Sequence, residues 1–300
     1  MAFYEKIQVP PPTFCPQCRL IRRLAWRNER TFYSRMCDKC KKAMISIYAP
    51  DRGLTVYCSP CWWKDDWDAL DFGVDFDPQK PFLIQLRELY QRVPQMTLHG
   101  LYTTIVNSDY THMVSYLKDC YMVTYSDYGE NLSYGSIVLN SKDSVDNLML
   151  DHGELCYETV NCEKCYRVWY SLDCENCNNV YFSKNCLGCN DCFGCVNLRN
   201  KQYHIFNKAY AKEEYERLLP ELLSSSFSKL QKSSEKAYAF WQGFPQKYTH
   251  GRHNTGVSGE YIRNCKNVKD SFMLANAQDC RFCTVSQGPL TDSYILAIME

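Results

Sequence analysis

A repeat of twelve residues runs through the middle of the chain and limits the folds that the chain can adopt. Successive rows begin at Ser108, Cys120, Leu132, Ser144 and Cys156 and, after one row of nine residues, at Cys165, Cys177, Cys189 and Lys201. The first position of a row is small or carries a thiol in seven of these nine rows, and mostly polar residues precede it. A fixed period with a polar corner and a buried small column is typical of a β-solenoid. We therefore predict a mainly β chain with twelve residues in a coil, or twenty-four if a row is half of a wider coil.

The repeat resumes after residue 252, and the remaining segments have a different character. New rows begin at Cys265, Ser271, Cys280 and Ser293. Apolar residues at helical spacing predict helices over 81–93, 211–223 and 227–241, and Pro220 should bend or shorten the second of these. The predicted parts are a zinc-binding module (1–78), a helical cap (79–106), a β-solenoid (107–207 and 246–300) and a helical insertion (208–245).

Cysteine is unusually frequent, with 19 residues, and many cysteines occupy repeat positions. One run, CxxCxxCxxC, is similar to iron–sulfur or zinc motifs and consists of Cys186, Cys189, Cys192 and Cys195. Position in a repeat is set by packing, however, and a buried cysteine behaves as a small apolar residue. We therefore expect core packing for Cys120, Cys156, Cys165, Cys177 and Cys189. A second metal site or a redox role for the CxxCxxCxxC run is the alternative.

Aromatic residues also align between rows. Trp169, Tyr181 and Phe193 share one column, and Tyr170 and Phe182 share the next. Because neighbouring positions of a strand face opposite sides, one column should face inward and the other outward. The helical insertion would cover the outer column, or that column would form a stacking platform for bases or sugars.

Three CxxC pairs lie within the first 61 residues: Cys15 and Cys18, Cys37 and Cys40, and Cys58 and Cys61. The pairs are separated by 18 and 17 residues, which is the spacing of zinc sites. Each pair directs two thiolates to one point, and four thiolates complete a tetrahedral zinc site that stabilises a segment too short to build its own core. We assign zinc first to the second and third pairs. The first pair would then need ligands from elsewhere, or would replace one of the other two.

The residues around the third pair favour a zinc ribbon. Two β-rich runs, 44–48 and 54–57, flank a Pro-Asp-Arg-Gly turn, which predicts a hairpin. Trp63 and Trp67 follow Cys61 and lie four residues apart, which is the spacing of one helix face.

Charge is unevenly distributed over this module, although the whole chain has a net charge of zero. Residues 1–48 contain ten Lys and Arg against three acids, whereas residues 49–78 contain two basic residues against seven Asp. The two halves either neutralise each other or leave a basic face for RNA, because arginines interleaved with aromatic residues suit phosphates and bases. The candidate nucleic-acid-binding residues are Arg22, Arg23, Arg27 and Arg30.

Long segments of the chain carry a resemblance to other proteins, among them FCPQCRLIRRLAWRNERTFYSRMCDKC, VYCSPCWWKDDWDAL and CFGCVNLRNKQYHIFNKAYAKEEYE. Over nearly its whole length the chain resembles a family of uncharacterised, Cys-rich repeat proteins of candidate-phyla bacteria that are described as zinc-binding. The resemblance implies a zinc module and a Cys-rich repeat body. It implies no activity and supplies no catalytic residues.

These features favour a non-enzymatic binding or scaffold protein that docks on RNA or a ribosomal surface. No HExxH, GxSxG, P-loop or GxGxxG motif occurs, so an enzyme would need an unrecognised site, for which His250 and His253 are candidates. A third possibility is a self-assembling structural solenoid, because the chain ends within a row and an open terminal coil would pair with another copy. The sequence has neither a secretory signal nor the roughly 20 apolar residues of a membrane helix, so we expect a cytoplasmic protein.

Overall fold

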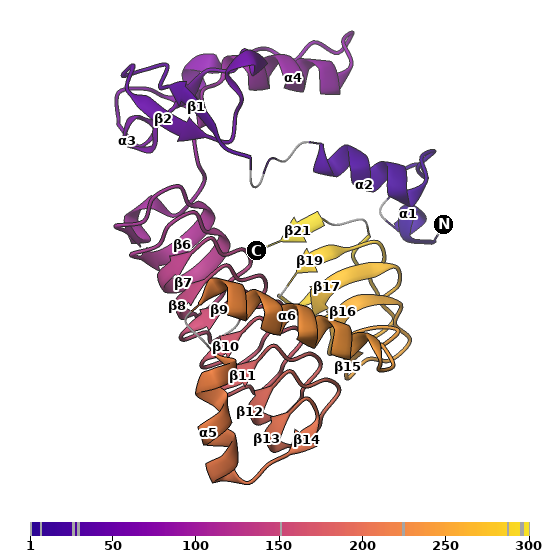
Figure 1. Ribbon diagram of the computed structural model, residues 1–300. Helices are drawn as coiled ribbons and strands as arrows, with labels where there is room; N and C mark the ends of the chain where they lie inside the picture. Colours follow the sequence, from indigo (N-terminus) through magenta and orange to yellow (C-terminus); the bar gives the residue numbers. More distant parts are fainter. Residues whose placement is uncertain are drawn as a thin grey trace. The chain divides into compact units, whose positions relative to one another are not determined.

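The computed structural model describes residues 2–6, 8–25, 28, 31–150, 152–223, 226–286, 288–294 and 297–299. The chain divides into two compact units, one formed by Glu29–Phe244 and the other by Met1–Asn28 together with Pro245–Glu300. Residues 1–78, which we predicted to form one module, therefore contribute to both units. The two blocks of the repeat likewise belong to different units, as the separate sheets in Figure 1 illustrate.

A ten-stranded sheet forms the centre of the first unit (Figure 1). Its strands are β5 (Ile105–Val106), β6 (His112–Lys118), β7 (Thr124–Ser133), β8 (Lys142–Val145), β9 (Cys156–Tyr157), β10 (Val168–Trp169), β11 (Val180–Tyr181), β12 (Asn190–Phe193), β13 (Gln202–Ile205) and β14 (Lys208–Ala209). The strands follow one another in chain order and are parallel, except that β14 turns back against β13. Each parallel pair joins residues that are twelve positions apart, such as Val114 with Ser126. The mainly β prediction is confirmed.

A left-handed backbone recurs at every third residue of these rows. From Asn107 to Phe206 each third residue has a positive φ, and Asn and Asp are frequent there. These two side chains tolerate the left-handed region better than others because they form local hydrogen bonds. The residue after each left-handed one points inward, and burial therefore recurs with a period of three, as at Val114, Leu117 and Cys120. Four such steps make one row of twelve.

The predicted nine-residue row is wrong. Tyr157 pairs with Trp169, twelve residues later, and the spacing continues unchanged through the following strands. The error has a physical origin, because any shift by three residues places another inward residue in the same column. The sequence pattern alone therefore does not distinguish a shift of nine from a shift of twelve.

Small residues fill the interior because the rows are narrow. Many inward cysteines and serines make the same hydrogen bond, from the side chain to the carbonyl two residues earlier. The Sγ of Cys174 lies 3.4 Å from the carbonyl oxygen of Leu172, and the Oγ of Ser171 lies 2.9 Å from that of Trp169. The five row cysteines that we expected in the core are all buried. Burial is therefore compatible with either residue type, since the donated hydrogen bond satisfies the polar atom.

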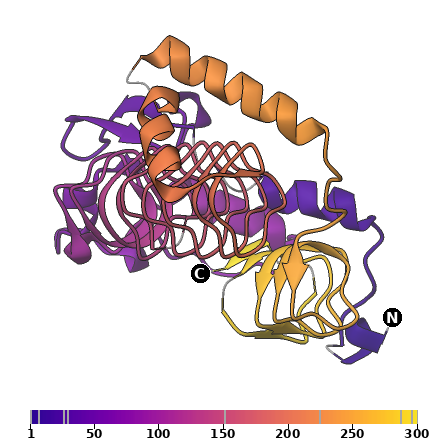
Figure 2. The same ribbon diagram turned by 60° about the horizontal axis from the view of Figure 1, so that its bottom comes forward.

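Both aromatic columns lie outside this thiol-rich interior, so the prediction that one of them faces inward is wrong. They pack beneath α5 (Lys212–Leu222) and α6 (Phe227–Gln242), which contribute the buried Tyr215 and Trp241. The rings of Tyr170 and Phe182 stack with centroids 4.7 Å apart. Figure 2 shows these two helices lying over the rows. The helical insertion is thus confirmed as the cover of the aromatic columns, and α5 continues through Pro220.

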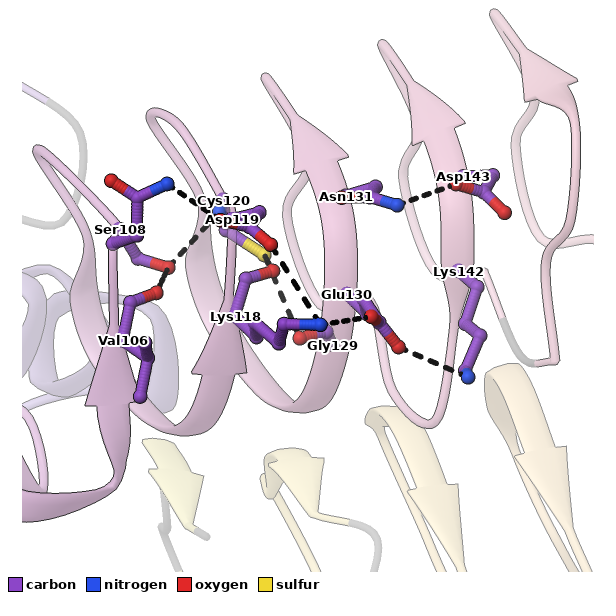
Figure 3. Close-up of polar contacts among 11 residues, drawn as sticks. Val106, Ser108, Lys118, Asp119, Cys120, Gly129, Glu130, Asn131, Lys142 and Asp143 are labelled. Atoms are coloured by element: carbon purple, nitrogen blue, oxygen red, sulfur yellow. Dashed lines mark hydrogen bonds and ion pairs between the residues drawn. The ribbon is translucent and has the colours of Figure 1, made fainter.

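Polar ladders connect the exposed corners of neighbouring rows (Figure 3). The ammonium groups of Lys118 and Lys142 lie 2.7 and 3.0 Å from the carboxylate of Glu130, which lies between them. Hydrogen bonds from these two lysines lower the pKa of Glu130 to about 2. One position further on, the Nδ2 of Asn131 donates to the Oδ1 of Asp143 over 2.8 Å. Each ladder joins residues twelve positions apart and so supports the register of the rows.

The second unit contains a five-stranded parallel sheet and the N-terminal helices. Its strands are β15 (Gly251–Arg252), β16 (Gly259–Arg263), β17 (Ser271–Ala275), β19 (Thr284–Ser286) and β21 (Ala297–Met299), beside the pair β18 (Ala277–Gln278) and β20 (Leu290–Thr291). Helices α1 (Ala2–Lys6) and α2 (Pro16–Leu24) contact the end of this sheet. Lys6 Nζ lies 2.8 Å from Asp292 Oδ2, and the rings of Tyr4 and Tyr294 meet edge to face. A segment of the same chain therefore covers this end, contrary to our expectation, and pairing of the last strand with another copy remains a prediction.

The segment before the rows holds short elements. They are β1 (Tyr33–Met36), β2 (Ala43–Ser46), β3 (Val56–Tyr57), β4 (Gln95–Met96), α3 (Ser59–Trp62), α4 (Phe82–Arg92) and the 3-10 helices η1 (Pro50–Arg52), η2 (Ala69–Phe72) and η3 (Tyr102–Thr104). The predicted amphipathic helix over 81–93 corresponds to α4.

The left-handed corners predict a specific response to substitution at Asn131, whose φ is 53°. Asn131→Val should lower the free energy of unfolding by about 1–2 kcal/mol more than Asn131→Gly, because both variants lose the contact with Asp143 but only valine resists this backbone. Denaturant unfolding of the two variants measures the difference. Equal stabilities would contradict a left-handed requirement at this corner.

Candidate metal centre

Four cysteines come together in the segment before the rows. The sulfur atoms of Cys37, Cys40, Cys58 and Cys61 all lie within 4.8 Å of one another, so this group can hold a metal ion. Cys37 and Cys40 lie in the turn between β1 and β2, while Cys58 precedes α3 and Cys61 lies within it. This is the set of ligands that we assigned first from the sequence.

The hairpin that presents the first two cysteines differs from the predicted one. Strand β2 pairs antiparallel with β1, which precedes it in the chain, and β3 pairs in parallel with β4. The Pro-Asp-Arg-Gly segment forms η1 and does not join two paired strands. The turn that contains the first two cysteines closes the hairpin instead, with the amide of Lys41 donating to the carbonyl of Cys37 over 2.9 Å.

Backbone amides surround the sulfur of Cys37. The amide nitrogen of Cys58 lies 3.3 Å from this sulfur, and the amide of Cys40 also donates to it. Although burial raises the pKa of the Cys37 thiol, these hydrogen bonds lower it to about 6. The sulfurs of Cys40 and Cys58 are 3.8 Å apart. The surroundings therefore stabilise the thiolate of Cys37, which is the form of cysteine that binds a metal ion, whereas burial raises the pKa of the Cys58 thiol to about 12 and also raises that of Cys61.

Asp38 connects the two CxxC pairs, a role that we did not predict. Its Oδ2 accepts hydrogen bonds from the amide of Val56 over 2.6 Å and from the guanidinium of Arg35 over 3.0 Å. The same guanidinium donates to the carbonyl of Leu54 over 3.0 Å. The carboxylate between Cys37 and Cys40 thus holds strand β3, which leads to Cys58 and Cys61. The only sequence signal was an Arg three residues before an Asp inside a CxxC pair.

Charge pairing accounts for part of the basic segment. Besides Arg35, Lys39 forms an ion pair with Asp66, and hydrogen bonding to this lysine lowers the pKa of Asp66. One acidic residue of the second half therefore pairs with a basic residue of the first half, which is the kind of contact that the neutralisation interpretation expects.

The aromatic residues after Cys61 pack differently from our prediction. Helix α3 ends at Trp62, and Trp67 donates its indole N–H to the carbonyl of Trp62 over 2.8 Å. The rings of these two tryptophans lie 4.7 Å apart, whereas Trp63 is exposed. The predicted helix face shared by Trp63 and Trp67 is therefore wrong, because α3 ends at Trp62, before both residues.

Cys15 and Cys18 are not among the four cysteines whose sulfurs converge. They are exposed at the start of α2, in the other compact unit. The amide of Cys18 donates to the sulfur of Cys15 over 3.3 Å, and this contact lowers the pKa of the Cys15 thiol.

The predicted nucleic-acid-binding arginines are only partly described. Arg22 is exposed in α2, and its guanidinium lies 4.9 Å from the ring centroid of Phe14. Arg23 belongs to α2, but its side chain lies outside the description, and Arg27 and Arg30 lie outside the described residues.

The CxxCxxCxxC run occupies four successive inward positions of the rows. All four are buried, and neighbouring thiols contact one another, since hydrogen bonds with Cys186 and Cys192 lower the pKa of the Cys189 thiol. We call the group of Cys37, Cys40, Cys58 and Cys61 the Cys37 centre. Across the described residues, it is the one group in which three or more His, Cys, Asp or Glu side chains converge closely enough for a metal ion.

The sequence matches no protein-family model and no curated protein. Within the part of the chain that the structure describes, no helix has both the length and the apolar character needed to cross a membrane.

The contacts of Asp38 predict that it supports metal binding without touching the metal. Asp38→Ala should weaken metal affinity about 10- to 100-fold, the usual effect of losing a group that orients ligands. Asp51→Ala, at an exposed position of the same module, is the matched control. Competition with a chromophoric chelator measures both affinities. An unchanged affinity in the Asp38 variant would show that the cysteine pairs are positioned without it.

Proposed function

We propose that this protein is a non-enzymatic binding scaffold in which a zinc centre organises one segment and a β-solenoid supplies a rigid body. The observation that carries the proposal is the convergence of the four sulfurs of the Cys37 centre within 4.8 Å. Four thiolates in a closed group suit zinc, which favours tetrahedral sulfur coordination in structural sites. No open position is left for a reacting ligand, which favours a structural over a catalytic role.

The zinc ion would supplement the small core of this segment, in which Ile47, Val56 and Met96 are buried. Its strands contain only two to four residues, and α4 exposes Phe82 and Leu83. Metal binding can contribute the folding energy of such a segment, because the site does not exist in the unfolded chain. Zinc would thereby present the surface of the module to a partner in one fixed conformation.

The rows support a β-solenoid with one coil for every twelve residues. Besides the sheet, isolated parallel bridges join Leu148, Val160, Leu172, Lys184 and Val196, each twelve residues from the next. A second ladder on another part of each row is expected if every row closes on the one before it. Inward side chains at every third position then form the core, and the outward positions form a regularly repeating surface.

RNA, or a ribosomal surface, is the partner that we propose for the basic segment. The support is the excess of basic residues in 1–48 together with Arg22, which is exposed to solvent and lies over the ring of Phe14. An arginine beside an aromatic ring suits both the phosphate and the base of a nucleotide.

The zinc proposal predicts that purified protein contains zinc and that Cys58→Ser with Cys61→Ser removes it from the centre. Elemental analysis and thermal unfolding, with and without a chelator, measure occupancy and its effect on stability. We expect chelation to unfold the segment around the centre while the rows persist. Protein that binds no transition metal under reducing conditions would refute the proposal.

The RNA proposal predicts binding that weakens steeply with salt, because phosphate contacts release counterions. Arg22→Glu together with Arg23→Glu should abolish binding to a single-stranded RNA of mixed sequence. Lys212→Glu together with Lys232→Glu, at α5 and α6, is the control of equal charge change. Affinity that is independent of salt, or equal losses in both double variants, would rule out this site.

A further inference from the structure

The cysteines of the chain fall into three groups, and one group has no structural role so far. Four form the Cys37 centre, thirteen are buried in the rows of the two units, and the remaining two are Cys15 and Cys18. Both of these are exposed. Since every other cysteine is committed to the metal centre or to a core, the chain has no spare thiol to join this pair.

The exposed pair has the local geometry of the pairs in the metal centre. The amide of Cys18 donates to the sulfur of Cys15, three residues earlier, over 3.3 Å. The amide of Cys40 contacts the sulfur of Cys37 in the same way, and the amide of Cys61 contacts that of Cys58. All three pairs therefore have the form of a knuckle that directs two sulfurs to one metal ion.

The exposed pair is also held on a fixed support. The guanidinium of Arg19 donates to the hydroxyl of Tyr4 over 2.8 Å and lies 5.9 Å from the ring centroid of Phe282. These contacts attach α2 to the sheet of its own unit. The two thiols are thus presented to solvent from an anchored helix, which reduces the entropy that a ligand must overcome to order them.

A closed zinc site needs four ligands, and this pair supplies two. Among the described residues, no third His, Cys, Asp or Glu converges with Cys15 and Cys18. Around them, Phe14, Ile21 and Leu24 expose 52%, 62% and 42% of their surface. A half-complete metal site beside exposed apolar side chains calls for a second surface that brings two more thiolates and covers these residues.

We propose that two copies of this chain share one zinc ion, held by Cys15 and Cys18 of each copy. A two-fold axis through the metal ion makes the two half-sites identical, as in an isologous interface. Four thiols release their protons to solvent when the ion binds, and the resulting site carries two negative charges. Arg19 and Arg22 of both copies supply compensating positive charge. The inference extends the proposed zinc chemistry to a second site but does not depend on occupancy of the Cys37 centre.

The test measures mass and metal content of the full chain in the presence of a phosphine reductant, which prevents disulfides. We expect a dimer with about three zinc ions per two chains. Dialysis against a chelator should give monomers, and adding Zn²⁺ back should restore the dimer. Cys15→Ala together with Cys18→Ala should give a monomer with about one zinc ion per chain. Both substitutions lie at exposed positions, and Gln17→Ala in the same turn is the control.

The outcomes separate this inference from the proposed function. A monomer with one zinc ion per chain, or a dimer that persists in the chelator and in the double alanine variant, would overturn the shared site. A Cys15–Cys18 disulfide that forms despite the reductant would overturn it as well. A zinc-dependent dimer with about half a zinc ion per chain would support the shared site and refute zinc in the Cys37 centre.

Discussion

The left-handed residue at every third position is the constraint on which the rest of the rows depends. A residue with positive φ turns the chain, so that one residue of each triplet points into the interior and two point outward or along the corner. Four triplets complete a row, and the parallel pairing at twelve residues follows from that count. Asn and Asp occupy many corners because they adopt this backbone at the least cost and bond across rows.

The narrow interior explains why so many cysteines fit in the core of the rows. Only small or slender side chains fit, and most inward positions hold Cys, Ser, Thr, Val, Leu or Gly. At Gly129 even a Cβ atom would lie 2.5 Å from Leu132 and 2.9 Å from Leu117. A thiol fits because it is small and because its proton is donated to a nearby carbonyl. Among the described residues, cysteines are close enough to hold a metal ion where two CxxC pairs converge, at Cys37, Cys40, Cys58 and Cys61.

The two roles of cysteine also divide the functions that we propose. Buried thiols stabilise the rows, and the helices over the aromatic columns leave those columns unavailable as a stacking platform. The partner surfaces that we propose are those of the short-stranded segment and of α2. Both depend on CxxC pairs, so zinc would decide the shape of one surface and the pairing of the other.

The sequence by itself determined the twelve-residue period, the helical insertion and the four cysteines ranked first as a metal-binding group, because each is a local pattern of residue types at fixed spacing. It left open whether one coil has twelve or twenty-four residues and whether Cys15 and Cys18 replace one of the other pairs. Only the tertiary structure decided that Tyr157 pairs with Trp169. With inward residues at every third position, the sequence pattern looks the same when one row is displaced by three residues along the next. The tertiary structure also decided the partner strand of β2 and the bridging role of Asp38. The N-terminal residues likewise join the C-terminal sheet through contacts between segments nearly three hundred residues apart, such as Lys6 with Asp292, and such pairing leaves no periodic trace in either segment.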